Sequence, residues 1–188
     1  TVWIQELINA DLYIAPPAIE DGGGLEVLRP ETLAALRAAP GVAAVSTYRR
    51  LTVELAEQPV AVMAVELAPA SEAGYRLLAG DPAVVWPAFR RGAVILVSEP
   101  LAWRQKLRVG DNLAVPTDRG LRHYPIAGIF LDYGSEHGRI LLPRSLYERD
   151  WSQPTVGSTA VFAAPGQDLA ALRTRLQAQL GPLQPLIF

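Results

Sequence analysis

A polar cluster between Asp132 and Leu141 contains residue types that bind metals and carry out acid-base chemistry. Asp132, Glu136 and His137 offer carboxylate and imidazole groups, which are common ligands of a catalytic zinc. The only other histidine in the chain is His123. The candidates surround glycines in a predicted turn, and the adjacent Glu136 and His137 would point to opposite faces of a strand. The spacing therefore favours a solvated turn between two strands, and we predict no metal ligands.

The same cluster offers partners for a serine nucleophile. Ser98, with His123 or His137 and with Asp132, supplies the residue types of a catalytic triad. However, Ser98 stands in VSEPL, which lacks the GxSxG turn that presents a nucleophilic serine. Its position before Glu99 predicts a helix N-cap instead. We therefore predict that Asp132 caps local backbone groups and that no residue is catalytic.

Neither phosphate nor nucleic acid is indicated as a ligand. The glycine-rich EDGGGLE stretch at 20–26 lacks the GxxxxGK[ST] and GxGxxG patterns. The net charge is -2, and arginine pairs such as Arg49-Arg50 and Arg90-Arg91 are scattered and typical of solvated faces. The absence of cysteine excludes disulfides and thiolate sites. We predict no bound cofactor and no nucleic-acid partner.

The first third of the chain predicts a strand, a helix and two more strands. ADLYIAPP is a short strand ended by prolines. Pro30 suits the first turn of the following helix, which Pro40-Gly41 ends. Two strands then surround a tight turn at Glu57-Gln58, and the apolar run from Val60 to Val65 indicates a strand buried on both faces.

The middle of the chain begins with a segment of no clear pattern and continues with clear strand and helix patterns. From Ala68 to Pro87, glycines and prolines interrupt any long element, and we regard this segment as a candidate hinge. A strand then enters a helix at Ser98, and a hairpin follows with its turn at 118–120. A further strand leads into a short helix that ends near Trp151.

The last stretch predicts a strand, a helix and a strand. Its helix carries a leucine stripe at spacings of three and four residues, which is typical of a core-facing side. The stripe consists of Leu169, Leu172, Leu176 and Leu180.

The order of these elements predicts an α+β fold in two lobes. A βαββ unit at the start and a βαβ unit at the end can share one sheet in the split, ferredoxin-like manner. Residues 1–67 and 154–188 would form this lobe, and residues 68–153 would form an inserted, mixed α/β second lobe.

The two ends of the chain look like cuts in a longer protein. The chain lacks an initiator Met, and an apolar face at its start predicts an opening amphipathic helix. It closes on the apolar PLQPLIF. No run approaches the roughly 18 apolar residues that cross a bilayer. The residues on the helical face are Trp3, Ile4, Leu7 and Ile8.

Several collinear motifs resemble the extracytoplasmic domain of FtsX-like, MacB-type permeases of ABC transporters. The similarity rests on GAVILVSEPLAWRQKLRVGDNLAVPT and on YPIAGIFLDYGSEHGRILLPRSLYERDW, with ADLYIAPP and LRAAPGVAAVSTYRR before them. Within these stretches the matching features are Ser98-Glu99, Gly110-Asp111, Gly128-Ile129, Asp132-Tyr133-Gly134, and Tyr147 with Trp151.

The resemblance implies a porter-like first lobe with the second lobe inserted into it. It implies a domain on the periplasmic side of the inner membrane, between transmembrane helices. It also implies no catalysis in this piece, since a cognate ABC ATPase would hydrolyse ATP elsewhere. The domain would transmit conformational change and contact substrate or a periplasmic adaptor. No residue identifies the cargo, and no binding residues are transferred from the family.

Two alternatives stay open from the sequence. The first is a free-standing, soluble ligand-binding or regulatory module with a ferredoxin-like lobe. The second is a small hydrolase that uses the region of Ser98 or His137, which would require a histidine within hydrogen-bonding reach of Ser98 or Asp132.

Overall fold

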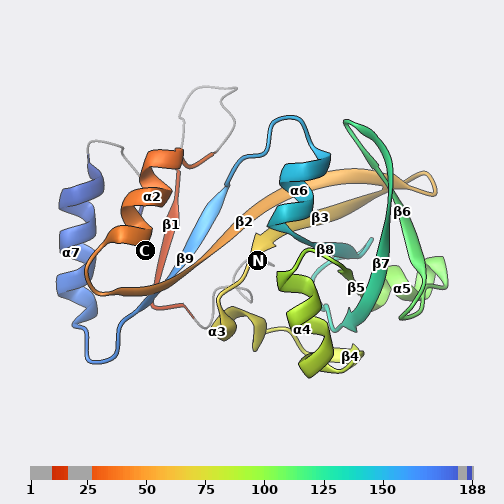
Figure 1. The fold of residues 1–188 in the computed structure, drawn as a ribbon, viewed down its shortest axis with the longest axis horizontal. Helices are drawn as coiled ribbons and strands as arrows, with labels where there is room; N and C mark the ends of the chain where they lie inside the picture. Colours follow the sequence, from red (N-terminus) through yellow and green to blue (C-terminus); the bar gives the residue numbers. More distant parts are fainter. Residues whose placement is uncertain (1–9, 17–26, 182–185, 188) are drawn as a thin grey trace.

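The computed structural model of the chain describes residues 10–16, 27–181 and 186–187. The predicted opening helix and the glycine-rich stretch at 20–26 lie outside these residues. The described part forms a mixed α/β fold around one ten-stranded sheet (Figure 1). The strand order is β10-β1-β9-β2-β3-β8-β5-β7-β4, and β6 pairs with β7 outside this path.

One end of the sheet has the interlocked topology predicted from the element order. Strands β10, β1, β9 and β2 are neighbours, and every pair among them is antiparallel. Helix α2 joins β1 to β2 across β9, and α7 joins β9 to β10 across β1, which is the split βαβ, ferredoxin-like arrangement. The elements of this ferredoxin-like half are β1 (Leu12–Ala15), α2 (Pro30–Ala38), β2 (Val42–Leu55), β9 (Ser158–Ala163), α7 (Leu169–Leu180) and β10 (Leu186–Ile187).

The other end of the sheet is built by the middle of the chain. Strand β3 pairs in parallel with β8, β8 pairs antiparallel with β5, and β5 pairs in parallel with β7. The elements of this second half are β3 (Gln58–Glu66), α3 (Pro69–Glu72), β4 (Leu77–Ala79), α4 (Pro82–Arg90), β5 (Ile95–Ser98), α5 (Glu99–Gln105), β6 (Asn112–Thr117), β7 (Gly120–Phe130), β8 (Arg139–Pro143) and α6 (Arg144–Asp150).

Strand β2 belongs to both halves. Its first part, from Val42 to Tyr48, pairs with β9, and its second part, from Thr47 to Leu55, pairs with β3. In Figure 1, β2 runs from the end that holds α2 and α7 to the hairpin tip at the end that holds α5. A strand of 14 residues spans roughly 45 Å at about 3.3 Å per residue. The two halves are therefore parts of one hydrogen-bonded sheet.

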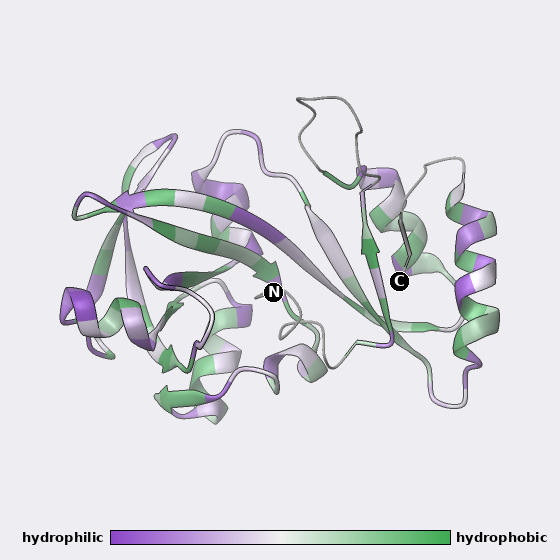
Figure 2. Cartoon of the chain, turned by 180° about the vertical axis from the view of Figure 1, so that it is seen from behind, coloured by the Kyte–Doolittle hydropathy of each residue, from purple (hydrophilic) through white to green (hydrophobic). Residues whose placement is uncertain are grey.

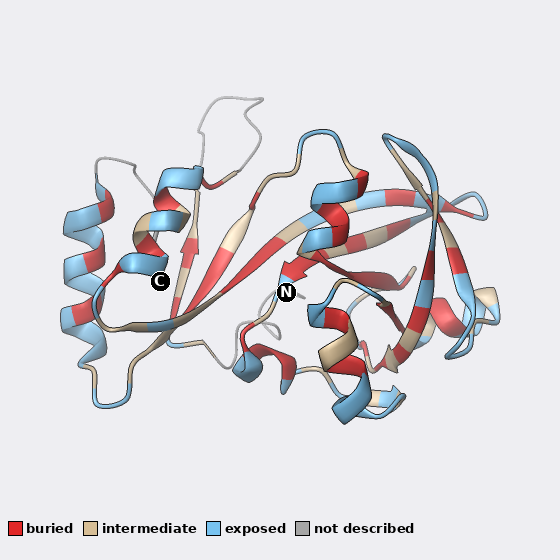
Figure 3. Cartoon of the chain, in the orientation of Figure 1, coloured by how far each residue is buried: buried red, intermediate tan, exposed pale blue. Residues whose placement is uncertain are grey.

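Buried apolar residues form three clusters along this sheet. Figures 2 and 3 show the hydrophobic and the buried stretches of its strands and helices. The first lies under α2 and α7, where Leu36 and Leu172 are both 0% exposed. The second lies on the opposite sheet face, under α4, around Trp86 and Phe89. The third fills the second half around Tyr124 and includes residues of the β2–β3 hairpin. Burial of these faces is the dominant force holding the halves in place.

Local signals place the helix boundaries as expected. Helix α2 has Pro30 at its start and Glu31 in its first turn, which favours the positive end of the helix dipole. Helix α7 begins after Asp168, whose carboxylate accepts hydrogen bonds from the amides of Ala170 and Ala171 at 2.9 and 3.2 Å. Three of the four stripe leucines of α7 are buried, as predicted. The fourth, Leu169, is 40% exposed because it is the first residue of the helix.

Two other sequence predictions need adjustment. Leu55 pairs directly with Gln58, so the hairpin turn consists of Ala56 and Glu57, one residue earlier than predicted. Both turn residues have positive φ, at 48° and 62°, as a type I′ turn requires. Strand β3 is buried at alternate positions, and Ala61 and Met63 are only half-buried, so the prediction of two buried faces is wrong.

The segment from Ala68 to Pro87 contains short elements, as predicted, but Pro87 lies inside α4 and does not interrupt it. Helix α3 has 4 residues, β4 has 3 and α4 has 9. Within the described residues, no helix is long and apolar enough to cross a membrane. The division into lobes at residues 67 and 154 stays a prediction, as does the hinge.

Candidate functional site

A buried ion pair closes the base of the loop between β7 and β8. Asp132 follows β7 by two residues, and Arg139 is the first residue of β8. Nε and Nη2 of Arg139 donate to the two carboxylate oxygens of Asp132, each at 2.9 Å. The Asp132 side chain is 0% exposed and that of Arg139 is 9% exposed. The two groups form a bidentate pair shielded from water, which fixes both ends of the loop.

Asp132 also holds the backbone of this loop. Its carboxylate accepts hydrogen bonds from the Gly134 amide at 2.9 Å and from the Ser135 hydroxyl at 2.5 Å. Burial alone would raise the pKa of Asp132, but the hydrogen bonds from Arg139, Ser135 and Gly134 outweigh it and lower the pKa below its ordinary value. The predicted capping of backbone by Asp132 is confirmed, whereas its ion pair with Arg139 was not foreseen from the sequence.

Ser98 occupies the N-cap position of α5, yet its hydroxyl caps no amide of that helix. The hydroxyl instead accepts a hydrogen bond from the amide of Arg139 at 2.8 Å, in a fully buried position. Pro100 in the first turn of α5 has no N–H to offer, and the neighbouring strand β8 brings the Arg139 amide to Ser98. The predicted capping role of Ser98 is therefore wrong, and the hydroxyl ties β8 to β5.

The histidines and Glu136 do not converge on a metal site. Arg104 of α5 donates to the carbonyl oxygen of Glu136 at 2.5 Å and to that of His137 at 3.1 Å. Its Nη1 also lies 3.4 Å from Nδ1 of His137. His123 is exposed on β7, opposite Ala114. Within residues 10–16, 27–181 and 186–187, no group of three or more His, Asp or Glu side chains is placed to hold a metal ion.

These positions leave Ser98 without the partners of a triad. Among the described residues, no hydrogen bond joins Ser98 to His123 or His137, and Asp132 is bonded to Arg139 instead of to a histidine. The arrangement can fix the loop against α5 and β5, but it offers no base to activate the serine.

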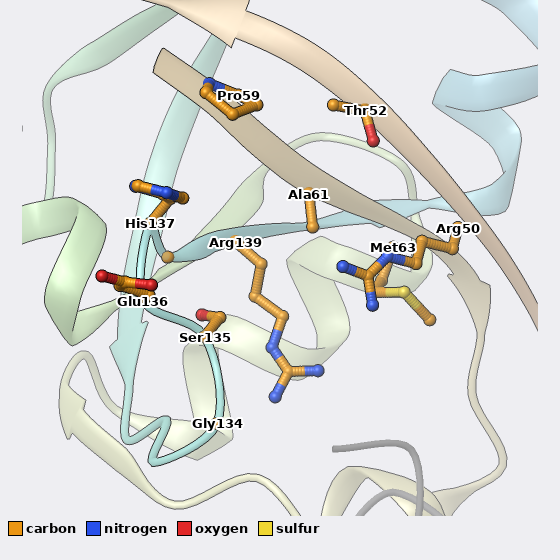
Figure 4. A pocket seen from close by; sticks show the side chains of 11 residues that line it. Arg50, Thr52, Pro59, Ala61, Met63, Gly134, Ser135, Glu136, His137 and Arg139 are labelled. Carbon is orange, nitrogen blue, oxygen red and sulfur yellow. The ribbon is translucent and has the colours of Figure 1, made fainter. Parts of the chain in front are cut away.

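A cavity of about 270 Å³ opens between this loop and the β2–β3 hairpin (Figure 4). Glu136 and His137 line it, so two of the residues singled out from the sequence lie at its wall. In Figure 4 the guanidinium groups of Arg50 and Arg139 extend into the same space. The full lining consists of Arg50, Thr52, Pro59, Ala61, Met63, Gly134, Ser135, Glu136, His137, Gly138 and Arg139.

A second cavity of about 510 Å³ is lined by the end of β3, by residues of α3, α4 and α6, and by Arg37 of α2. Its lining includes the apolar residues Leu67 and Phe89 beside several charged residues. Its charged residues all belong to ion pairs, so the cavity presents no unbalanced charge. The pairs are Arg37 with Glu66 at 3.0 Å, Arg90 with Glu72 at 2.5 Å, and Arg144 with Glu148 at 2.9 Å.

A further buried carboxylate anchors α6 to β7. Asp150 is 2% exposed and accepts a hydrogen bond from the Tyr124 hydroxyl at 2.6 Å. Arg149 donates to both of its oxygens, at 2.8 and 2.6 Å, and this contact is the main reason that the pKa of Asp150 is lowered. Burial, and then the bond to Asp150, raises the pKa of Tyr124. This network is structural, since it fills the interior of the second half.

Comparison with known proteins identifies the family of the chain. Residues 4–179 match the model of the MacB-like periplasmic core domain. The chain belongs to that family. The MacB-like periplasmic core domain is a component of ABC transporter permeases, so the resemblance predicted from the sequence is confirmed.

One curated relative is itself described as an ABC transporter permease. An uncharacterized ABC transporter permease protein of Mycobacterium tuberculosis is 27% identical over 190 residues, which is 98% of this chain and 22% of the relative. The chain thus spans about a fifth of the length of that protein.

Two solved structures show the same fold at low sequence identity. The periplasmic region of MacB from Actinobacillus actinomycetemcomitans has a TM-score of 0.71 and 13% identity, covering 98% of this chain and 91% of that chain. The extracellular domain of the noncanonic ABC-type transporter YknZ from Gram-positive bacteria has a TM-score of 0.60 and 12% identity, with 90% and 94% covered. Because these identities are low, the likeness is evidence of shared fold alone.

Proposed function

We propose that this MacB-like domain transmits conformational change between the membrane part of an ABC permease and the periplasmic side of an inner membrane. The cognate ABC ATPase would drive the motion from the opposite side of the membrane. The domain itself would contact substrate or an adaptor and would break no bonds. Family membership supports the setting, because domains of this family are parts of permeases.

The observation that carries the proposal is the sharing of β2 by both halves. Backbone hydrogen bonds join β2 to β9 as far as Tyr48 and to β3 from Thr47 onward. A displacement of the ferredoxin-like half therefore acts on the second half through a continuous strand, which bends between its two paired parts so that the halves change their relative position. Shared elements of this kind are a usual means of coupling distant sites.

A spin-label experiment on the full-length permease with its ATPase tests this role. Cysteines replace Arg119, at the tip of the β6–β7 hairpin, and Arg173, on the exposed side of α7; the chain has no cysteine of its own. The control pair replaces Glu31 and Arg173, both in the ferredoxin-like half. We expect the Arg119–Arg173 distance to change between nucleotide-free and ATP-bound protein, and the control distance to stay constant.

The outcomes of this experiment are distinct. If both distances are the same in every nucleotide state, the domain does not relay motion between its halves and the proposal fails. If the control pair moves as well, the ferredoxin-like half is not a rigid body, which also contradicts the proposed relay.

A further inference from the structure

The cavity of about 270 Å³ beside the β7–β8 loop contains an arginine without an ion-pair partner in the part of the chain that the structure describes, and the cavity of about 510 Å³ does not. In the larger cavity every charged side chain has an opposite partner. In the smaller one, Arg139 is paired with Asp132, but Arg50 forms no ion pair and donates no side-chain hydrogen bond among the described residues. A guanidinium carries five donors and a permanent positive charge, so Arg50 can accept an anion without breaking an existing contact.

The position of Arg50 directs that charge into the cavity. Arg50 lies on the exposed side of β2 and is paired across the hairpin with Met63. Figure 4 shows its guanidinium group beside the Met63 side chain, on the side of the cavity that faces Arg139. Asp132 balances the charge of Arg139, so Arg50 supplies the positive charge that an anion in this volume would meet.

The other lining residues restrict the size, the charge and the apolar part of an anion that fits this cavity. Pro59, Ala61 and Met63 of β3 form an apolar wall. The volume of about 270 Å³ lies just below the range of about 300–1,000 Å³ that is usual for drug-sized ligands, so a small ligand is indicated. Glu136 is exposed on the loop wall and disfavours a second negative charge.

We propose that this cavity binds a small monocarboxylate with a short aliphatic tail. The carboxylate pairs with the Arg50 guanidinium in a bidentate manner, and the tail contacts Met63 and Ala61. The Asp132–Arg139 pair holds the opposite wall in place. This site goes beyond the proposed relay, because a domain with an empty cavity can still transmit motion, and a domain that does not transmit motion can still bind the ligand.

The binding test uses the isotopically labelled 188-residue chain and NMR titration with hexanoate. Domains of similar extent from relatives have been crystallised as separate chains, which supports the use of this chain alone. We expect saturable shifts of amide signals in residues 134–139 and 61–63, with a dissociation constant on the order of millimolar. Acetate, which lacks the tail, and 1-hexanol, which lacks the charge, should each bind more weakly.

Three variants distinguish binding of hexanoate in this cavity from nonspecific electrostatic attraction between hexanoate and the protein. Arg50→Ala should weaken hexanoate binding by about tenfold or more, because a charge-assisted contact is lost. Glu136→Gln should leave binding unchanged or make it tighter. Arg91→Ala, at an exposed arginine outside the cavity lining, should have no effect. Signal dispersion in the Arg50→Ala spectrum reports whether the variant is folded, as the exposed position of Arg50 leads us to expect.

The proposal is overturned by any of four results. These are shifts confined to residues outside the cavity, equal binding of hexanoate by the parent chain and by folded Arg50→Ala, equal binding of 1-hexanol and hexanoate, and inorganic phosphate binding as tightly as hexanoate. The last result would indicate a general anion site in place of a carboxylate site with an apolar wall.

Discussion

Substitution of Asp132 by Asn tests whether the buried ion pair holds the loop and the sheet together. The change removes a charge on a side chain that is 0% exposed and leaves the Arg139 guanidinium, 9% exposed, without its counter-charge. Removal of one partner of a buried pair costs about 3–5 kcal/mol, and we expect about 3 kcal/mol because Asn keeps one acceptor oxygen. For a chain of this size, that loss lowers Tm by roughly 6–12 °C.

Thermal and urea unfolding followed by circular dichroism measure the effect. Glu66→Gln serves as the matched control, because its ion pair with Arg37 has side chains that are 56% and 45% exposed. An exposed pair of this kind contributes less than about 1 kcal/mol. The double variant Asp132→Asn/Arg139→Gln should be more stable than Asp132→Asn alone, since no buried charge is left unpaired.

The pH dependence gives an independent measurement of the same pair. The pKa of Asp132 is lowered in the folded protein, so the unfolded chain binds this proton at a higher pH, near the ordinary value of about 3.9. The stability from the pair is complete above that value and is lost as pH falls through the folded pKa. The stability difference between the parent and Asp132→Asn should therefore shrink on acidification, while Asp150, with its pKa also lowered, cancels from the comparison.

Two results would refute this reasoning. One is an Asp132→Asn variant that loses no more stability than Glu66→Gln at neutral pH. The other is a stability difference that does not shrink on acidification. Either would mean that the pair and its hydrogen bonds contribute no more than a solvated pair does.

The remaining predictions concern a loop glycine, a buried tyrosine and the candidate hinge. Gly138→Ala should destabilise the fold by roughly 2–5 kcal/mol in urea unfolding, because φ is +79° and a Cβ would lie 2.6 Å from a side-chain carbon of Leu101. Gly120→Ala, with φ at +103° and open space, should cost only about 1–2 kcal/mol, and equal losses would contradict the steric argument. Tyr124 should stay neutral in the folded chain above the ordinary tyrosine pKa of about 10, so stability falls as pH rises past that value; a smaller phenolate absorbance change near pH 10 in folded Tyr124→Phe than in the parent would argue against this. Hydrogen exchange across 68–87 should be faster than in the core strands, and equally slow exchange would exclude the hinge.

Much of the fold was predictable because its signals are local. Proline and glycine at helix ends, and the Asp-Arg-Gly turn at 118–120, depend on the backbone preferences of single residues. The order of strands and helices followed from these boundaries. The split βαβ topology then followed from the rules of connection, and the strand order around β1 and β9 confirms it.

The candidate site was predictable only in part, because its contacts join distant residues. The sequence located the polar turn at 132–138 and the capping role of Asp132, which depends on the Gly134 amide two residues away and the Ser135 hydroxyl three residues away. It did not indicate that Arg104 of α5 would hold the carbonyl groups of the loop, 32 and 33 residues further along the chain. No spacing rule connects residues so far apart before the strands are paired.

The sequence by itself indicated the family, most of the element order and the approximate positions of the turns, since each depends on short, collinear patterns. The tertiary structure alone decided the partner of Ser98, because the pairing of β5 with β8 brings an amide 41 residues away to its hydroxyl. It also decided that β2 belongs to both halves and that Arg50 and Arg139 border one cavity. These features depend on strand register, which is set when the apolar faces of the whole sheet are buried together.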